Sequence, residues 1–127
     1  MNEPYVDYEL AKLLKEKGFD EPCNYFFKYS SKVIYFGTEF KNSQIGELFF
    51  NAPTIRDALK WLKKKYGIYA SPIEQGNSDE PPTGQYTWCV SKDSVIYRNH
   101  TVSEKLTWAD AGKEALKFAL INVVKAL

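Results

Sequence analysis

The chain has 127 residues, with 17 Lys and Arg against 16 Asp and Glu, so its formal net charge is +1. This length suits one domain, which can bury about two-thirds of its unfolded surface. The balanced charge argues against bulk electrostatic attraction to nucleic acid or anionic lipid, and 44% apolar with 26% charged residues is not a disordered composition. We therefore predict a single globular domain over 1–127.

The first segment with a clear local pattern is a helix that begins after Asp7. Asp is a favoured N-cap residue, and Leu10, Leu13 and Leu14 recur at helical spacing. Gly18 supplies the left-handed residue that commonly ends a helix.

Strands are expected in the aromatic segment that follows. The runs 24–29 and 32–36 are rich in aromatic and β-branched residues and flank Ser30 and Ser31, a break short enough for a hairpin. The short apolar run 47–50 indicates a further strand.

A second helix is expected from Thr54 to Gly67. Thr54 with Asp57 three residues later forms an N-terminal capping pattern. Apolar residues from Ile55 to Tyr66 recur at helical spacing and predict one buried face.

Three more strands are expected after the second helix, at 68–73, 85–91 and 94–98. The last two form a hairpin, and the segment 74–84 lacks large apolar residues and contains two consecutive prolines. We interpret 74–84 as a mobile loop between strands.

The chain closes with a helix opened by the capping pattern Thr107 to Asp110. The element order is α-β-β-(β)-α-β-β-β-α, and the short connections favour antiparallel pairing. We predict an α+β fold with an antiparallel sheet of about five strands and three helices packed on one face.

Residue patterns typical of catalytic or metal sites do not occur in this sequence. His100 stands in a polar segment with no nucleophile elbow elsewhere, and Cys23 and Cys89 lie far apart in no metal-binding spacing. No glycine-rich phosphate loop occurs. We therefore expect no catalytic residues, no metal and no cofactor. The two cysteines are expected to be free thiols. We also expect a soluble cytoplasmic protein with no membrane segment.

The strongest charge feature is the second helix, where one acid, Asp57, stands among five basic side chains. They are Arg56, Lys60, Lys63, Lys64 and Lys65. One interpretation is a phosphate-contacting face with Trp61 or Tyr69 as a stacking platform; the other is the solvated face of an amphipathic helix.

The aromatic content is the second feature, with nine Tyr, eight Phe and three Trp. A sheet covered by helices on one side leaves its other face open, and strand alternation directs some aromatics there. The candidates for such a face are Tyr25, Tyr29, Tyr35, Tyr86, Trp88 and Tyr97. One interpretation is an exposed surface that binds a protein partner, a second copy of the chain or nucleic-acid bases. The other is that these half-buried aromatics only fill space on the sheet.

Three segments carry a family resemblance: the helix from Tyr8 to Phe19, the start at Ala52-Pro53-Thr54 with Leu59 and Trp61 after it, and the opening Thr107 to Asp110. They resemble the helices of small uncharacterised proteins of phages, prophages and Bacteroides-type genomes, in which a Pro follows the Thr where this chain has Trp108. The resemblance implies a mobile-element origin and no known activity.

The leading hypothesis is a non-enzymatic interaction domain that binds a protein partner, or another copy of itself, through an aromatic sheet face. The alternative is a nucleic-acid-binding accessory protein that uses the basic helix 54–66.

Overall fold

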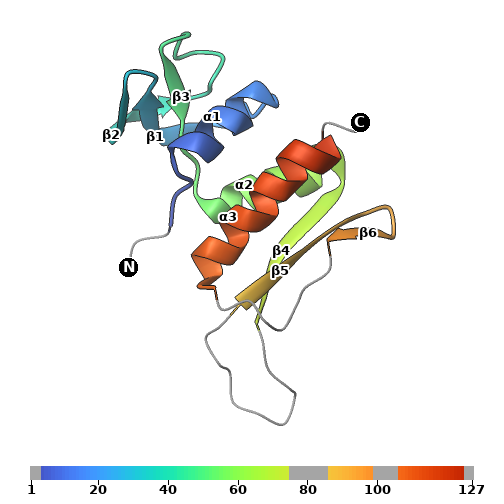
Figure 1. The fold of residues 1–127 in the computed structure, drawn as a ribbon. Helices are drawn as coiled ribbons and strands as arrows, with labels where there is room; N and C mark the ends of the chain where they lie inside the picture. The colour runs from blue at the N-terminus through green and yellow to red at the C-terminus, as the bar shows by residue number, and fades with distance from the viewer. Residues whose placement is uncertain (1–3, 75–85, 99–105, 125–127) are drawn as a thin grey trace. The chain divides into compact units, whose positions relative to one another are not determined.

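The computed structural model describes residues 4–74, 86–98 and 106–124 (Figure 1). Contacts divide the chain into two compact units, residues 1–55 and 56–127, and each is described by itself. The predicted loop 74–84 lies outside the described residues except for Glu74, and so does His100.

The N-terminal unit begins with α1 (Tyr8–Glu16), which confirms the first predicted helix. The Asp7 side chain accepts a hydrogen bond from the Leu10 amide at 2.9 Å. At the other end, Gly18 has φ +93° and the Phe19 amide donates to the Leu14 carbonyl at 2.9 Å, which is the Schellman arrangement. The capping residues read from the sequence therefore set both ends of this helix.

Three antiparallel strands complete the unit in the order β2-β1-β3: β1 (Cys23–Lys28), β2 (Ser31–Phe40) and β3 (Phe49–Asn51). The predicted hairpin is confirmed, and β2 runs four residues beyond its expected end. One face of the sheet lies under α1, where the Tyr8 ring contacts Phe27 and Phe50 at centroid distances of 5.7 and 5.1 Å. Phe27 and Phe50 are buried, so this face forms the core of the unit.

The C-terminal unit contains α2 (Ile55–Tyr66), which begins at the boundary, and the strands β4 (Ile68–Glu74), β5 (Tyr86–Lys92) and β6 (Val95–Arg98). The strands pair antiparallel in that order, and Pro72 is tolerated because β4 is an edge strand. The turn between β5 and β6 places Asp93 and Ser94 at φ 51° and 66°.

The last helix, α3 (Trp108–Phe118), continues as a π-helical turn at Ala119–Val123. Its N-cap is Thr107, whose hydroxyl accepts from the Asp110 amide at 3.1 Å as the sequence predicts. The helix packs on β4 and β5, and Trp88 contacts Phe118 at 5.6 Å between ring centroids. The guanidinium of Arg56 in α2 lies 5.3 Å from the Trp108 ring centroid.

The structure confirms an α+β fold with three helices and antiparallel strands, but the prediction of one sheet of about five strands was wrong. There are two three-stranded sheets, separated in the chain by α2. Local patterns identify strands without identifying their partners. The predicted single domain over 1–127 stays a prediction.

Candidate functional site: an aromatic pocket on the first sheet

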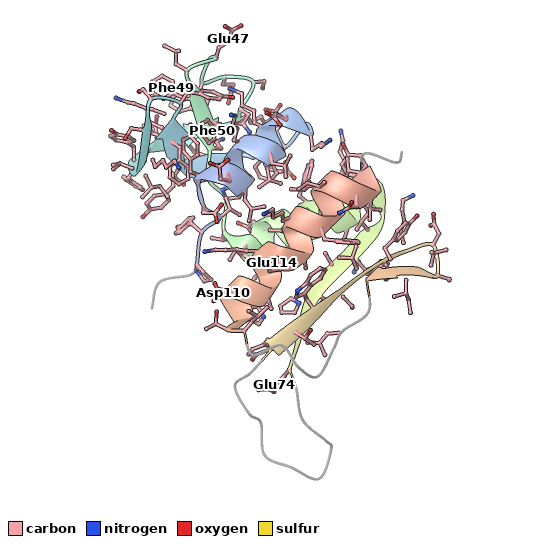
Figure 2. All side chains as sticks on the ribbon, in the orientation of Figure 1. Glu47, Phe49, Phe50, Glu74, Asp110 and Glu114 are labelled. Carbon is pink, nitrogen blue, oxygen red and sulfur yellow. The ribbon has the colours of Figure 1, made fainter. Side chains whose placement is uncertain are left out.

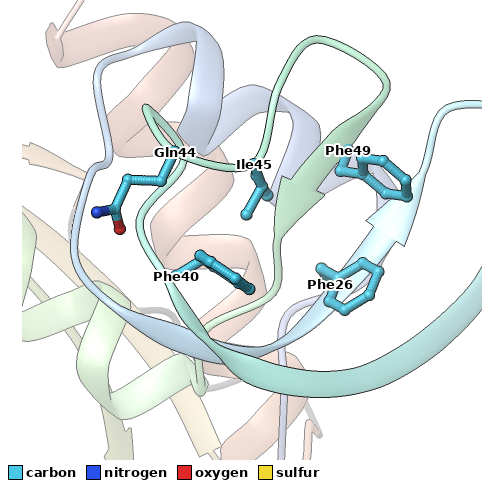
Figure 3. Close-up of a pocket in the computed structure, with 5 residues that line it drawn as sticks. All are labelled: Phe26, Phe40, Gln44, Ile45 and Phe49. Carbon is cyan, nitrogen blue, oxygen red and sulfur yellow. The ribbon is translucent and has the colours of Figure 1, made fainter.

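A pocket of about 250 Å³ opens on the β2-β1-β3 sheet (Figure 3). Its lining is formed by Phe26, Phe40, Gln44, Ile45 and Phe49. Strand neighbours point to opposite faces, so Phe27 and Phe50 face α1 whereas Phe26 and Phe49 face away from it. The neighbouring residues Phe49 and Phe50 of β3 are labelled in Figure 2. The pocket therefore lies on the side of the sheet opposite α1.

The aromatic rings of the pocket are held in fixed geometry by one another. Phe26 meets Phe49 edge to face, with centroids 5.6 Å apart and planes at 84°, and stacks on Tyr35 at 5.9 Å and 20°. Gly37 permits this placement, because a Cβ at that position would lie 3.0 Å from Cε1 of Phe26. One wall of the pocket thus depends on a position without a side chain.

The opposite wall is the segment 41–48 between β2 and β3, which two buried asparagines tie to the rest of the unit. The Asn42 amide donates to the Phe19 carbonyl at 2.8 Å, and its Oδ1 accepts from the Asn51 backbone amide at 2.7 Å. The Asn51 side chain in turn donates to the Phe40 carbonyl. Buried polar groups need such partners, so these bonds specify one position for the segment.

Two ionisable residues secure the same segment from outside. Asp20 accepts hydrogen bonds from the Ser43 amide at 2.7 Å and from its hydroxyl at 2.9 Å. The ammonium of Lys15 donates to the carbonyls of Gly46 at 2.9 Å and Phe49 at 2.5 Å. Partial burial lowers the pKa of Lys15, and the nearby Glu47 carboxylate opposes that shift.

The interior of the pocket presents carbon atoms. Gln44 is the lining residue with a polar side chain, and its Oε1 accepts from the Lys41 amide at 2.9 Å while the amide group points away from the phenylalanine rings (Figure 3). Lys28 lies beside Phe49 in the strand register, and its Nζ is 4.8 Å from the Tyr35 ring centroid. The site is therefore an apolar recess with an ammonium group on the same sheet face.

The six aromatics predicted to share one open sheet face do not share it. Tyr25 and Tyr35 lie in the first sheet and Tyr29 in the turn after β1, whereas the other three lie in the second sheet. In the first unit, Tyr25 contacts Tyr5 at 4.5 Å and Tyr29 contacts Phe50 at 4.6 Å, both on the α1 side. Tyr35 alone of the three lies on the pocket side. The sequence shows that neighbouring strand residues point to opposite faces, but it does not show which of the two faces the helix covers.

The three candidates in the second sheet are also dispersed. Trp88 is only 6% exposed and packs under α3, so its inclusion in an open face was wrong. Tyr86 is half-buried and forms an isolated bridge with Leu106, whereas Tyr97 on β6 is exposed.

The basic residues predicted on the second helix lie together along α2. All five are exposed: Arg56, Lys60, Lys63, Lys64 and Lys65. Trp61 is buried and cannot serve as a stacking platform, but Tyr69 is 54% exposed and lies 5.1 Å from the Lys63 ammonium.

Among the residues that the structure describes, no group of three or more His, Cys, Asp or Glu side chains could hold a metal ion. Cys23 and Cys89 are half-buried and form no disulfide bond in the described structure, and burial raises the pKa of the Cys89 thiol above its ordinary value of 9.0. Among the described helices, none is long and apolar enough to cross a membrane.

Comparison with known proteins gives no match to a protein family, to a curated protein or to a solved structure. The resemblance to phage and Bacteroides-type proteins stays a prediction. Of the aromatic residues that form the pocket, sequence reasoning singled out none. The available signal was the consecutive aromatics in 24–29 and 47–50, which place rings on both faces of a strand but do not predict the loop that encloses one of those faces.

Proposed function

We propose that this protein is a non-enzymatic interaction domain that binds a protein partner through the aromatic face of the β2-β1-β3 sheet. The observation that carries the proposal is the pocket between Phe26, Phe40 and Phe49, open to solvent and lined by carbon. Exposing an apolar recess to water is unfavourable compared with burying the same side chains in a core. Such recesses are typical of binding surfaces.

The dimensions of the pocket favour one side chain of a partner over a large organic ligand. A cavity of about 150 Å³ accommodates benzene, and pockets for drug-sized molecules start at about 300 Å³. The value of about 250 Å³ lies between them. A phenylalanine, leucine or methionine anchor matches this space, and interface hot spots commonly consist of such an anchor in a formed pocket.

The anchoring of the segment 41–48 also supports a receptor role. Asn42, Asp20 and Lys15 hold this wall before any ligand arrives. A formed pocket avoids the entropic cost of ordering a loop during association. Affinity can then come from a small contact area.

Selection from a phage-displayed random-peptide library tests this proposal while the partner is still unidentified. Ile45→Glu places a charge in the pocket, and Leu48→Glu is the matched control because Leu48 is 72% exposed and outside the lining. We expect enriched peptides to carry a bulky apolar residue and to bind the wild type and Leu48→Glu but not Ile45→Glu. Peptides that bind all three proteins equally, or no enrichment, would overturn the proposal.

A second candidate function is binding of single-stranded nucleic acid by α2, favoured by the ammonium of Lys63 beside the exposed Tyr69 ring. A base can stack on such a ring while neighbouring lysines contact phosphates.

Binding of an oligothymidylate measured against salt concentration tests this alternative. Changing Lys60, Lys63 and Lys64 to Gln should reduce the slope of log affinity against log salt by about 2, because each single-strand phosphate contact contributes about 0.7. The control is a triple Gln variant at other lysines, namely Lys12, Lys32 and Lys117. Equal losses in both triple variants, or no binding at low salt, would exclude a site on α2.

A further inference from the structure

The pocket and Lys28 form a two-part site, and this inference rests on the proposed function of the same sheet face. Lys28 in β1 is directly paired with Phe49 in β3, one of the pocket residues. Paired residues on adjacent antiparallel strands project from the same face with Cβ atoms about 5 Å apart. The ammonium group of Lys28 therefore belongs to the surface that surrounds the pocket.

The position of this ammonium is fixed by an aromatic ring. Its Nζ lies 4.8 Å from the centroid of Tyr35, which itself stacks on the pocket residue Phe26. A cation over a ring face keeps hydrogen-bond donors directed away from the ring. Lys28 is half-buried, so part of its long side chain is already ordered before a ligand binds.

Two acidic residues, Glu39 and Glu47, lie close in sequence to the pocket residues. Glu39 is exposed in β2, and Glu47 interacts electrostatically with Lys15 of α1. Among the strand pairs of the described residues, neither acid is paired with a pocket residue, whereas Lys28 is paired with Phe49. The charge that the strand register places directly beside a pocket residue is therefore positive.

We propose that this site recognises an acidic peptide segment of a partner protein, in which a hydrocarbon side chain enters the pocket and an adjacent carboxylate pairs with Lys28. The apolar contact supplies most of the affinity, and the carboxylate supplies selectivity for charge. A phenylalanine anchor is favoured over tyrosine, because the carbon lining offers no partner for a buried hydroxyl group.

Capped tripeptides serve as the probe, titrated into ¹⁵N-labelled full-length protein and followed by the amide shifts of the first unit. The set is Asp-Phe-Asp, Lys-Phe-Lys, Asp-Tyr-Asp and Asp-Ala-Asp, whose symmetric flanks remove any dependence on peptide direction. We expect Asp-Phe-Asp to bind about fivefold more tightly than Lys-Phe-Lys, because each exposed ion pair contributes up to about 1 kcal/mol. Replacing Phe by Ala should weaken binding by at least about tenfold, since a buried ring contributes about 1.5–3 kcal/mol.

Charge reversal at Lys28 isolates the electrostatic part of the site. Lys28→Glu should invert the preference between Asp-Phe-Asp and Lys-Phe-Lys, whereas Lys28→Met should abolish the preference and keep the phenylalanine dependence. Phenylalanine peptides that bind the wild type equally with either flank would overturn this inference and leave the proposed function standing. Failure of every phenylalanine peptide to perturb the pocket residues would overturn both.

Discussion

The buried amide of Asn42 provides the sharpest test of how the pocket is built. Its two hydrogen bonds, to the Phe19 carbonyl at 2.8 Å and from the Asn51 amide at 2.7 Å, join the end of α1 to the last strand in the unit. Asn42→Ala removes both bonds and leaves a carbonyl and an amide without these partners. Asn42 is only 6% exposed, so water does not readily replace them.

The size of the effect follows from the cost of unsatisfied buried groups. Each unsatisfied group costs about 1–3 kcal/mol, so the two left by Asn42→Ala should together lower the free energy of unfolding by about 2–6 kcal/mol. Asn24→Ala is the matched control, because the Asn24 side chain is exposed and donates one bond of 3.3 Å to the Gly37 carbonyl. The control should cost well under 1 kcal/mol, as is usual for exposed positions.

The assay must report on the first unit, and tryptophan fluorescence does not, because Trp61, Trp88 and Trp108 all belong to the second. Native-state hydrogen exchange of the β1 amides, combined with urea unfolding followed by circular dichroism, measures the relevant free energy. In Asn42→Ala we also expect weaker binding of the Asp-Phe-Asp tripeptide, since the wall 41–48 loses its anchor. A loss of stability no greater than that of Asn24→Ala would refute the role assigned to this network.

Three further predictions follow from backbone and charge. Gly37→Ala should push the Phe26 ring into the pocket, lower the affinity for the peptide and lower the free energy of unfolding by about 1 kcal/mol. Thr38→Ala is the control in a peptide titration, and equal affinities of the two variants would contradict the close approach of Phe26 to position 37. Ser94→Gly should raise the free energy of unfolding by about 1 kcal/mol, because Ser94 has φ 66°, and urea unfolding followed by fluorescence measures it; no gain would show that the turn is not strained. Burial lowers the pKa of Lys15 in the folded state, so the unfolded chain binds more protons than the folded chain at pH values between that pKa and 10.5. The free energy of unfolding of the wild type should therefore rise with pH across this window, relative to that of Lys15→Met. Parallel pH profiles of the two proteins in chemical unfolding would contradict this prediction.

The chain itself specifies its helices and hairpins through local chemistry. Asp7 and Gly18 delimit α1, Thr107 caps α3, and a segment rich in aromatic and β-branched residues pairs across Ser30. Each of these signals acts within a few residues, where side-chain oxygens, a positive φ or strand alternation suffice to fix the backbone. They are readable whatever the rest of the fold is.

The pocket needed contacts between distant residues. Phe26 and Phe49 become neighbours because β3 pairs with β1, and the segment 41–48 is held there by Asn42 and Lys15. None of these contacts has a periodic signature, because hydrogen bonds from a side chain to a distant carbonyl obey no spacing along the chain. Sequence reasoning could therefore identify aromatic strands but not the recess between them.

The folded protein shows where the charged and aromatic residues of this chain lie, which their numbers alone do not. By itself the sequence determined an α+β composition, the caps, the hairpins and a basic second helix, because these depend on local propensity and periodicity. Only the tertiary structure decided that the strands form two sheets, that Trp88 is buried, and that Lys28 stands beside an aromatic pocket. Packing over the whole unit determines which strands pair and which face of each sheet is covered. The alternation of side chains along a strand does not by itself show which of the two faces of the sheet will be covered.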